Sequence, residues 1–561
     1  MRRNITLLII LLFSLFLFVG CKNETTTKNI LTTTKSDITT TTEEPITTTE
    51  EPITTTQQDL NGFEFAMNAD LVSYYIVKYS GYDRGIIIPS EYNGLPVTTI
   101  GKDSFKDNTY VENIVIPDTV IAIEEQAFSY CTSLKQITIP NSITSMGIGV
   151  FYNCTSLESV ALPPSITTIE LGTFLGCTSL TQFIIQDTVT MIGDAAFDGC
   201  SSLTSITIPD SVTSIGVNAF CECLSLESII ISSSISKIED YAFCWCSSLK
   251  TITIPEGVTT IGENAFTSCS SLESVAIPNS VTSIGQYAFY KCSSLNKVNI
   301  SSLESWCGID YANLESNPLY YAHNLYLNNE LITDLLIPES VTRLKEYAFI
   351  GCLSIKTVVI PKTVSFIELG PFKDCNSIET ISIPFVGDER PGGYITHSYP
   401  FGQLFGSTDN LISVPKSIKT VILLDSCTYV KNDAFIDCRS IETVILPNTI
   451  GSIGYTSFAS CKSLKSINIP DSVKCIYTNA FFGCSSLTSI TIPTSVTLIG
   501  EYAFESCTSL TKVYYKGTES QWDLIDDSSD LSTKTIYFYS ETEPEGDGNF
   551  WHYVNGEVVE W

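Results

Sequence analysis

Apolar residues recur along this chain with a spacing that fits neither a continuous helix nor a long strand. From about residue 100 the unit L-x-x-I-x-I-P-x-S-V-x-x-I-G-x-x-A-F-x-x-C returns every 23 residues. The I-x-I alternation predicts a short strand, and the proline ends it because proline has no N–H to donate. The V-x-x-I segment predicts a second extended segment, followed by a glycine-permitted turn, as at Gly262. The pattern predicts a solenoid of 23-residue coils.

The cysteines follow the same period as the apolar residues. Stacked parallel coils lie ~4.8 Å apart, so each repeated Leu, Ile, Phe or Cys forms a continuous buried ladder. No coil can bury its apolar side alone, which makes the array cooperative. Fourteen cysteines, each three residues after a phenylalanine, form the predicted cysteine ladder: Cys131, Cys154, Cys177, Cys200, Cys223, Cys246, Cys269, Cys292, Cys352, Cys375, Cys438, Cys461, Cys484 and Cys507.

Two segments interrupt the period and divide the predicted solenoid, residues 101–516. They are a first insert near 302–337 and a second insert near 385–423, where the spacing of the proline position stretches to 37 and 40 residues. Both are expected to be modified coils that carry extra loops. Residues 61–100 are predicted to form an N-terminal cap and residues 517–561 an aromatic C-terminal cap, since a solenoid must cover its open ends.

The N-terminus has the features of an export signal. Arg2 and Arg3 precede an apolar run that is shorter than the ~20 residues of a membrane helix. Gly20 and Cys21 resemble a bacterial lipobox, although Phe18 stands where leucine is commonest. The resemblance implies a lipoprotein signal peptide over 1–20 and lipidation of Cys21; a plain signal peptide is the alternative. The threonine-rich residues 21–60 are predicted to be a disordered tether.

The repeat carries a family resemblance over roughly residues 80–516. Its L-x-x-I-x-I core, followed by IPxSVxxIGxxAFxxC, resembles the leucine-rich repeats of BspA-like bacterial surface proteins. That resemblance implies a mainly β, right-handed leucine-rich-repeat superhelix with a parallel sheet. It also implies an extracellular protein, lipid-anchored to a bacterial cell, that acts in adhesion by binding protein or glycan partners.

Charge and composition argue against other classes of function. The net charge of −31, from 30 Lys+Arg against 61 Asp+Glu, disfavours nucleic-acid binding. Three histidines, and no G-x-S-x-G, P-loop or H-E-x-x-H motif, predict a non-catalytic protein without cofactor or metal. A hydrolase hidden in the inserts or caps, tested by substituting His323 or His397, is the remaining enzymatic hypothesis.

The cysteines raise the question of disulfides in an exported chain. Ladder thiols are predicted to stay reduced, because the ~4.8 Å coil spacing exceeds the ~3.5–4.5 Å between Cβ atoms that a disulfide prefers. Cys221 and Cys244, one coil apart beside the turn, are the candidate disulfide. With Cys223 and Cys246 they could instead form a four-thiolate metal site.

The inserts hold the candidate partner-binding residues, because insertions on a repeat protein often carry its binding function. The alternative is that their aromatic residues seal an interrupted coil. The exposed strand face has no cluster of aromatic or Arg residues, and Glu227, Lys250 and Glu273 are expected to form a ladder of alternating charge on it. This uniform, polar strand face supports a second hypothesis, a structural cell-surface spacer without a dedicated ligand. The candidate partner-binding residues are Trp306, Tyr320, Tyr321 and Tyr326 in the first insert and Tyr394, Tyr399 and Phe401 in the second.

Overall fold

The computed structural model describes residues 57–58, 62–385, 401–407, 409–529, 531–544 and 548–561. The predicted signal peptide, Cys21, almost all of the tether, Tyr394 and Tyr399 lie outside these ranges.

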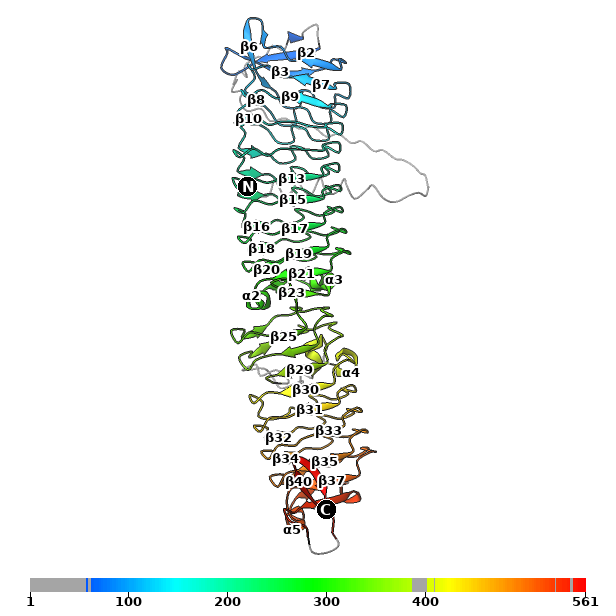
Figure 1. Cartoon of the computed structure of the whole chain (residues 1–561). Helices are drawn as coiled ribbons and strands as arrows, with labels where there is room; N and C mark the ends of the chain where they lie inside the picture. The colour runs from blue at the N-terminus through cyan, green and yellow to red at the C-terminus, as the bar shows by residue number, and fades with distance from the viewer. Residues whose placement is uncertain (1–56, 59–61, 386–400, 408, 530, 545–547) are drawn as a thin grey trace, which may run out of the picture. The chain divides into compact units, whose positions relative to one another are not determined.

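The described chain forms a stack of short coils, as Figure 1 shows. The L-x-x-I-x-I segment of most coils forms a strand that pairs in parallel with the strand 23 residues further on, so that Ile252 lies opposite Val275 and Val275 opposite Val298. The predicted solenoid of 23-residue coils with parallel sheets is therefore confirmed. The strands of this first set are β4 Gly85–Ile87, β7 Asn113–Val115, β9 Gln136–Thr138, β13 Ser205–Thr207, β15 Ser228–Ile230, β17 Thr251–Thr253, β19 Ser274–Ala276, β21 Lys297–Ile300, β23 Leu325–Leu327, β25 Asp334–Leu336, β27 Thr357–Val359, β29 Thr380–Ile383, β30 Thr420–Leu423, β31 Thr443–Ile445, β33 Ser466–Ile467, β35 Ser489–Ile492 and β37 Lys512–Tyr515.

The V-x-x-I segment contributes a second set of parallel strands, each only two residues long. Their isoleucine column stacks in register, for example Ile238 on Ile261 and Ile261 on Ile284. These short strands are β8 Ala122–Ile123, β10 Ser145–Met146, β11 Thr168–Ile169, β12 Met191–Ile192, β14 Ser214–Ile215, β16 Lys237–Ile238, β18 Thr260–Ile261, β20 Ser283–Ile284, β22 Asp310–Tyr311, β26 Arg343–Leu344, β28 Phe366–Ile367, β32 Ser452–Ile453, β34 Cys475–Ile476, β36 Leu498–Ile499 and β38 Asp526–Asp527.

The repeated glycine serves close packing between coils. We expected it to permit an unusual turn, but Gly262 is not among the glycines with positive φ. A Cβ atom there would come within 2.5 Å of the Asp240 Oδ1 atom and 2.6 Å of its amide nitrogen. The glycine is therefore required because the preceding coil leaves no room for a side chain.

The core is a set of ladders that run along the stack. Successive phenylalanine rings lie parallel, with centroids 5.7 Å apart for Phe220 and Phe243 and 5.5 Å apart for Phe243 and Phe266. Most phenylalanine amides donate to the carbonyl of a residue in the next coil that is usually alanine, as Phe243 does to Ala265 at 2.9 Å. Apolar burial and backbone hydrogen bonds therefore both stabilise the contact between neighbouring coils.

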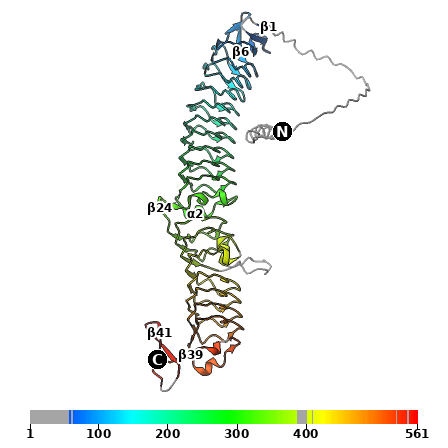
Figure 2. The same cartoon turned by 90° about the vertical axis from the view of Figure 1, so that its right-hand side faces the viewer.

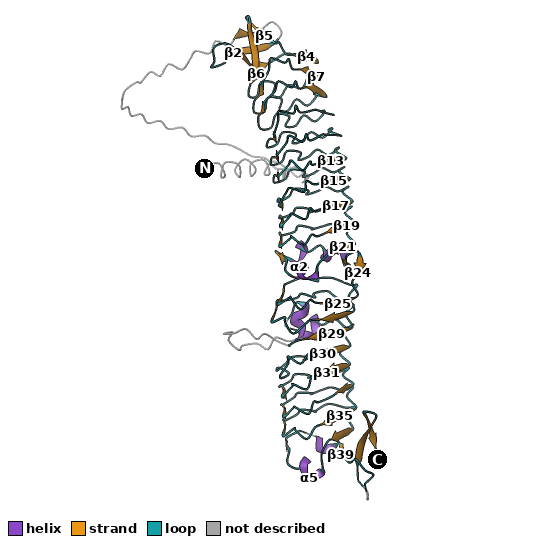
Figure 3. Cartoon of the chain, turned by 60° about the vertical axis from the view of Figure 1, so that its left-hand side comes forward, coloured by secondary structure: helices purple, strands orange, loops and turns teal. Residues whose placement is uncertain are grey.

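Both ends of the stack carry extra strands. At the N-terminal end, β1 Gln57–Gln58, β2 Phe63–Met67 and β3 Tyr74–Tyr79 pair antiparallel, and β3 continues in parallel through β6 Leu95–Ile100 into the coils, while β5 Glu91–Tyr92 pairs with β6. At the other end the stack continues beyond residue 516, through α5 Glu519–Trp522, β38, η3 Leu531–Thr533 and β39 Thr535–Tyr539. The hairpin of β40 Phe550–Val554 and β41 Glu557–Glu560 lies alongside the last coils (Figures 2 and 3).

Candidate functional site

The first insert is a stretched coil that remains part of the stack. Its β22 pairs with β20 and its β23 pairs with β21, so both strand columns continue through it. Here α2 Leu303–Cys307 lies between β21 and β22, and η1 Leu314–Ser316 and α3 Leu319–Ala322 lie between β22 and β23; Figure 1 labels α2 and α3. After β23 the chain turns into β24 Glu330–Leu331, which pairs antiparallel with it.

Trp306 lies inside this coil and is not a docking residue. Its side chain is 1% exposed, and its Nε1–H donates to the Ala348 carbonyl at 2.8 Å. In regular coils a phenylalanine amide of the preceding coil donates to this alanine carbonyl. The indole therefore takes the place of a missing backbone donor, assisted by the Asn317 amide at 3.3 Å. For Trp306 the prediction of partner binding is wrong, because a buried side chain offers no contact surface.

The second insert is also a stretched coil. Strands β29 and β30 on either side of it pair directly, and η2 Phe401–Phe405 and α4 Asn410–Ser413 occupy the turn. Phe401 joins the phenylalanine ladder, with its ring 5.3 Å from that of Phe435 and its amide donating to Ala434 at 2.8 Å. Phe401 is 1% exposed, so its predicted role in partner binding is wrong for the same reason as for Trp306.

The tyrosines of the first insert reach the surface. Tyr326 is half-buried on the strand face, where the Lys297 ammonium lies 4.7 Å from its ring centroid. Tyr320 and Tyr321 are half-buried on α3, with ring centroids 5.0 Å apart. These three remain candidate partner-binding residues.

Tyr320 and Tyr321 belong to a larger group, which we call the tyrosine patch: Tyr287, Tyr290, Lys291, Tyr320 and Tyr321. The Tyr287 and Tyr290 centroids are 5.6 Å apart, and the Lys291 ammonium lies 5.2 Å from the Tyr290 ring. Tyr321 is close enough to Tyr290 and to the Lys291 backbone for both to act on its pKa, which burial raises. Tyr287 and Lys291 are exposed, so the patch faces solvent.

Sequence reasoning missed the members of the patch that lie outside the insert. Tyr287, Tyr290 and Lys291 occupy variable positions of an otherwise regular coil, so no motif marks them. The available signal was their place in the last regular coil before an interruption. The Tyr287 amide confirms that this coil faces the insert, because it donates to the Asn313 side chain at 3.3 Å.

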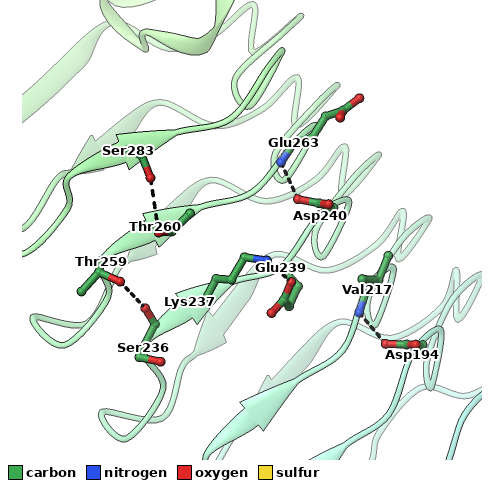
Figure 4. A network of polar contacts seen from close by, with 10 residues as sticks. All are labelled: Asp194, Val217, Ser236, Lys237, Glu239, Asp240, Thr259, Thr260, Glu263 and Ser283. Atoms are coloured by element: carbon green, nitrogen blue, oxygen red, sulfur yellow. Dashed lines mark hydrogen bonds and ion pairs between the residues drawn. The ribbon is translucent and has the colours of Figure 1, made fainter. Parts of the chain in front are cut away.

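Asp194 and Asp240, two of the acidic residues that precede the A-F pair, accept hydrogen bonds from the next coil. Figure 4 shows the Asp194 carboxylate accepting the Val217 amide and the Asp240 carboxylate accepting the Glu263 amide, each at 2.8 Å. These two carboxylates therefore satisfy backbone donors of the next coil. In the part of the chain that the structure describes, no three His, Cys, Asp or Glu side chains are grouped to hold a metal ion.

Replacing Asp240 by alanine should lower the free energy of unfolding by about 1–2 kcal/mol, because the Glu263 amide loses its acceptor. Asp240→Asn keeps an oxygen in place and should cost less. Urea unfolding followed by circular dichroism measures both. Equal losses for the two variants would show that the carboxylate charge, and not the hydrogen bond, matters.

The cysteine ladder is reduced and buried, as predicted. Twelve ladder thiols donate to the carbonyl oxygen of the phenylalanine in the preceding coil, as Cys246 does to Phe220 at 3.2 Å. The other two, Cys352 and Cys438, each follow a stretched coil. A weak donor small enough to fit beside stacked rings explains why cysteine occupies this position. Cys221 and Cys244 are also free thiols.

Of the two histidines in the enzymatic hypothesis, His397 lies outside the described residues. His323 ends α3 with φ 57° and its Nδ1 lies 2.9 Å from the Gly351 carbonyl, so it joins the insert to the next coil. Of the expected charge ladder, Glu227 and Lys250 form a surface ion pair at 2.9 Å, whereas Glu273 forms no ion pair with Lys250 among the described residues. None of the helices in the described ranges has the length and apolar character needed to cross a membrane.

Comparison with known proteins identifies the class. The model of the BspA type leucine rich repeat region matches residues 98–226, 213–308, 320–387 and 413–524, which together make up more than half of the chain. The chain belongs to this family of leucine-rich repeat proteins. No curated protein matches it.

Solved structures of bacterial leucine-rich repeat proteins are similar to it. A leucine-rich repeat protein from Bacteroides ovatus is 24% identical, with 86% of this chain and 99% of that chain covered and a TM-score of 0.34. A leucine rich cell surface protein from Faecalibacterium prausnitzii is 27% identical, covering 86% and 100%, with a TM-score of 0.29. The pneumococcal vaccine antigen PcpA is 16% identical, covering 87% and 94%, with a TM-score of 0.21.

Proposed function

We propose that this chain is a non-catalytic, lipid-anchored bacterial surface protein that binds a protein or glycan partner through the tyrosine patch. The observation that carries the proposal is the clustering of four tyrosines and a lysine at one interruption of a regular solenoid. Elsewhere on the coils, threonine and serine hydroxyls often donate hydrogen bonds to the neighbouring coil, as the Thr259 hydroxyl does to the Ser236 carbonyl (Figure 4).

The chemistry of the patch suits recognition. Tyrosine is enriched at binding hot spots because it presents a large rigid surface and a hydroxyl at little conformational cost. Tyr320 and Tyr321 pack against the core on α3, and Tyr287 extends from a coil held on both sides. The side chains are therefore largely ordered before a partner arrives, which lowers the cost of binding.

Anchoring extends the proposal to the rest of the chain. Lipidation at Cys21 and a threonine-rich segment over 21–60 would hold many copies of the solenoid at one membrane surface. Weak contacts at each patch would then add up through avidity.

The alternative function, a structural spacer without a ligand, is favoured by a different observation. Charges on the strand face are neutralised within the solenoid: Glu112 pairs with Arg84 and Lys135, and Glu442 pairs with Lys419 and Lys465. Such pairs leave little unsatisfied charge for a partner on that face.

Point substitutions test the proposal better than deletions, because removing 302–337 would remove β22 and β23 from the stack. The purified full chain, immobilised at physiological salt, is probed with host extracellular-matrix proteins and surface glycans. Tyr287→Ser combined with Tyr320→Ser should weaken saturable binding about tenfold or more.

Tyr502→Ser supplies the matched control. Tyr502 occupies the same repeat position as Tyr287, with φ 56° against 58°, and is 48% exposed, but it lies in a regular coil far along the stack. Its substitution should leave binding unchanged. Equal binding by the wild-type chain and all variants would show that the tyrosine patch is not the binding site. If the folded chain bound nothing in the panel, the result would favour a structural spacer.

A further inference from the structure

Cys221 and Cys244 differ from the ladder cysteines in their surroundings. They occupy equivalent positions of neighbouring coils, two residues before ladder cysteines, where the Glu222 amide donates to the Cys244 carbonyl at 2.8 Å. Cys221 is half-buried, whereas the fourteen ladder thiols are at most 2% exposed. A reagent in solution can therefore reach Cys221 but not the ladder.

A carboxylate completes this cluster. Asp198 is the equivalent residue one coil before Cys221, and the Gly199 amide next to it donates to the Cys221 carbonyl at 2.8 Å. The Asp198 carboxyl and the Cys244 thiol are both close enough to the Cys221 thiol to act on its pKa. Three chemically reactive side chains thus follow one another along a single column of the turn.

We propose that Cys221 and Cys244 are an oxidisable pair, which a small-molecule disulfide converts into a disulfide joining two neighbouring coils, with Asp198 as the proton acceptor for Cys221. This inference does not depend on the proposed binding function.

The reaction is thiol–disulfide exchange in two steps. In the first, the Cys221 proton passes to the Asp198 carboxylate while the Cys221 sulfur attacks one sulfur of the small disulfide, whose S–S bond breaks and releases one thiolate. In the second, Cys244 loses its proton to solvent and attacks the Cys221 sulfur, which expels the second small thiolate. Two cysteine thiols are oxidised, and one small disulfide is reduced to two thiols.

The electrostatics of the cluster give Asp198 this role. Burial and the neighbouring Glu222 carboxylate raise the pKa of Asp198 to about 7, while the Cys221 thiol lowers it. The pKa of Cys221 is raised by its hydrogen bond with Cys244, by burial, and by the charges of Asp198 and Glu222. Since free thiolate is scarce at neutral pH, attack benefits from a base that takes the proton as the new bond forms.

Other titratable groups around the cluster are less suited to that task. The ladder thiols Cys200, Cys223 and Cys246 feel the Asp198 charge but lie in the core. Tyr241 faces Cys244, and its pKa is raised. The pH dependence near neutrality should therefore report Asp198.

The test treats the reduced full chain with excess oxidised glutathione, alkylates remaining thiols, and maps peptides by mass spectrometry without reduction. The expected product is a Cys221–Cys244 cross-linked peptide. Cys244→Ser should stop at a glutathione adduct on Cys221. Cys475, half-buried without such a neighbouring cysteine, should give only an adduct in the wild-type chain.

The second readout is the rate of cross-linking against pH. In the wild-type chain the rate should rise through an inflection near pH 7, following Asp198. Asp198→Asn should abolish that inflection and slow the reaction about tenfold or more near pH 8. An Asp198→Asn chain that reacts as fast as the wild type would overturn the role of Asp198.

Cys484 and Cys507 provide an internal control for access. Their thiols also contact one another, but they are 0% and 2% exposed. They should not oxidise in the folded chain. Equal oxidation of both pairs, or a glutathione adduct on Cys221 that never resolves to a cross-link, would contradict the proposal.

Discussion

Raising the pH above about 9 should destabilise the solenoid steeply, because its ladder thiols must stay protonated in the folded state. Burial raises the pKa of Cys131 and Cys292 from 9.0 to about 12, and that of Cys154 well above its ordinary value. Below pH 9 both folded and unfolded chains keep these protons. Between about 9 and 12 the unfolded chain releases them first, so unfolding becomes more favourable as the pH rises.

The effect is large because the ladder repeats. Above pH 9, each buried thiol should lower the free energy of unfolding by about 1.4 kcal/mol per pH unit. Burial raises the pKa of thirteen ladder thiols, and together these would cost about 18 kcal/mol one unit above their unfolded pKa, more than the ~5–15 kcal/mol that stabilises typical domains. If a group of coils unfolds as a unit, the slope of the unfolding free energy against pH is proportional to the number of ladder thiols in that group.

Urea unfolding at a series of pH values between 8 and 10.5, followed by circular dichroism, measures this slope. The chain with both Cys246→Ser and Cys269→Ser should show a slope that is shallower by about two thiols, ~2.8 kcal/mol per pH unit. Tyrosine and lysine titrations are common to both proteins and cancel in the comparison. Identical slopes would show that ladder thiols do not govern alkaline stability.

The regular coils could be predicted from the sequence because each position recurs many times. A residue such as Phe243 or Cys246 faces the same neighbours in every coil, so one spacing predicts strand, turn and buried ladder together. The reason for the glycine was not accessible in the same way. Gly262 is required by its distance to Asp240, a contact between coils that a pattern within one coil does not show.

The inserts could be located but not interpreted, for a related reason. Each occurs once, so its aromatic residues had no periodicity to show which way they face. The sequence does not distinguish Trp306 from Tyr320, since both are aromatic residues of the first insert. In the structure Trp306 is 1% exposed, whereas Tyr320 is half-buried in the tyrosine patch. Burial there depends on which backbone groups of the next coil lack donors, which only the three-dimensional stack reveals.

Substitution of Trp306 should separate the two parts of the solenoid that meet at the first insert. Trp306→Phe keeps most of the ring but leaves the Ala348 carbonyl with the longer Asn317 bond alone, at an expected cost of about 1–2 kcal/mol. Trp306→Ala also opens a cavity and should cost about 3–5 kcal/mol.

Trp245→Ala is the matched control, since that indole projects from a regular coil and is 50% exposed. Its cost should stay within about 0.5 kcal/mol. Because coils interact only with their neighbours, the loss at Trp306 should be local. Hydrogen exchange should therefore increase first over residues 302–352 in Trp306→Ala, and limited proteolysis should cut the chain there while the coils on either side stay protected. Uniform exchange along the stack would instead show that the insert does not join two separately stable parts.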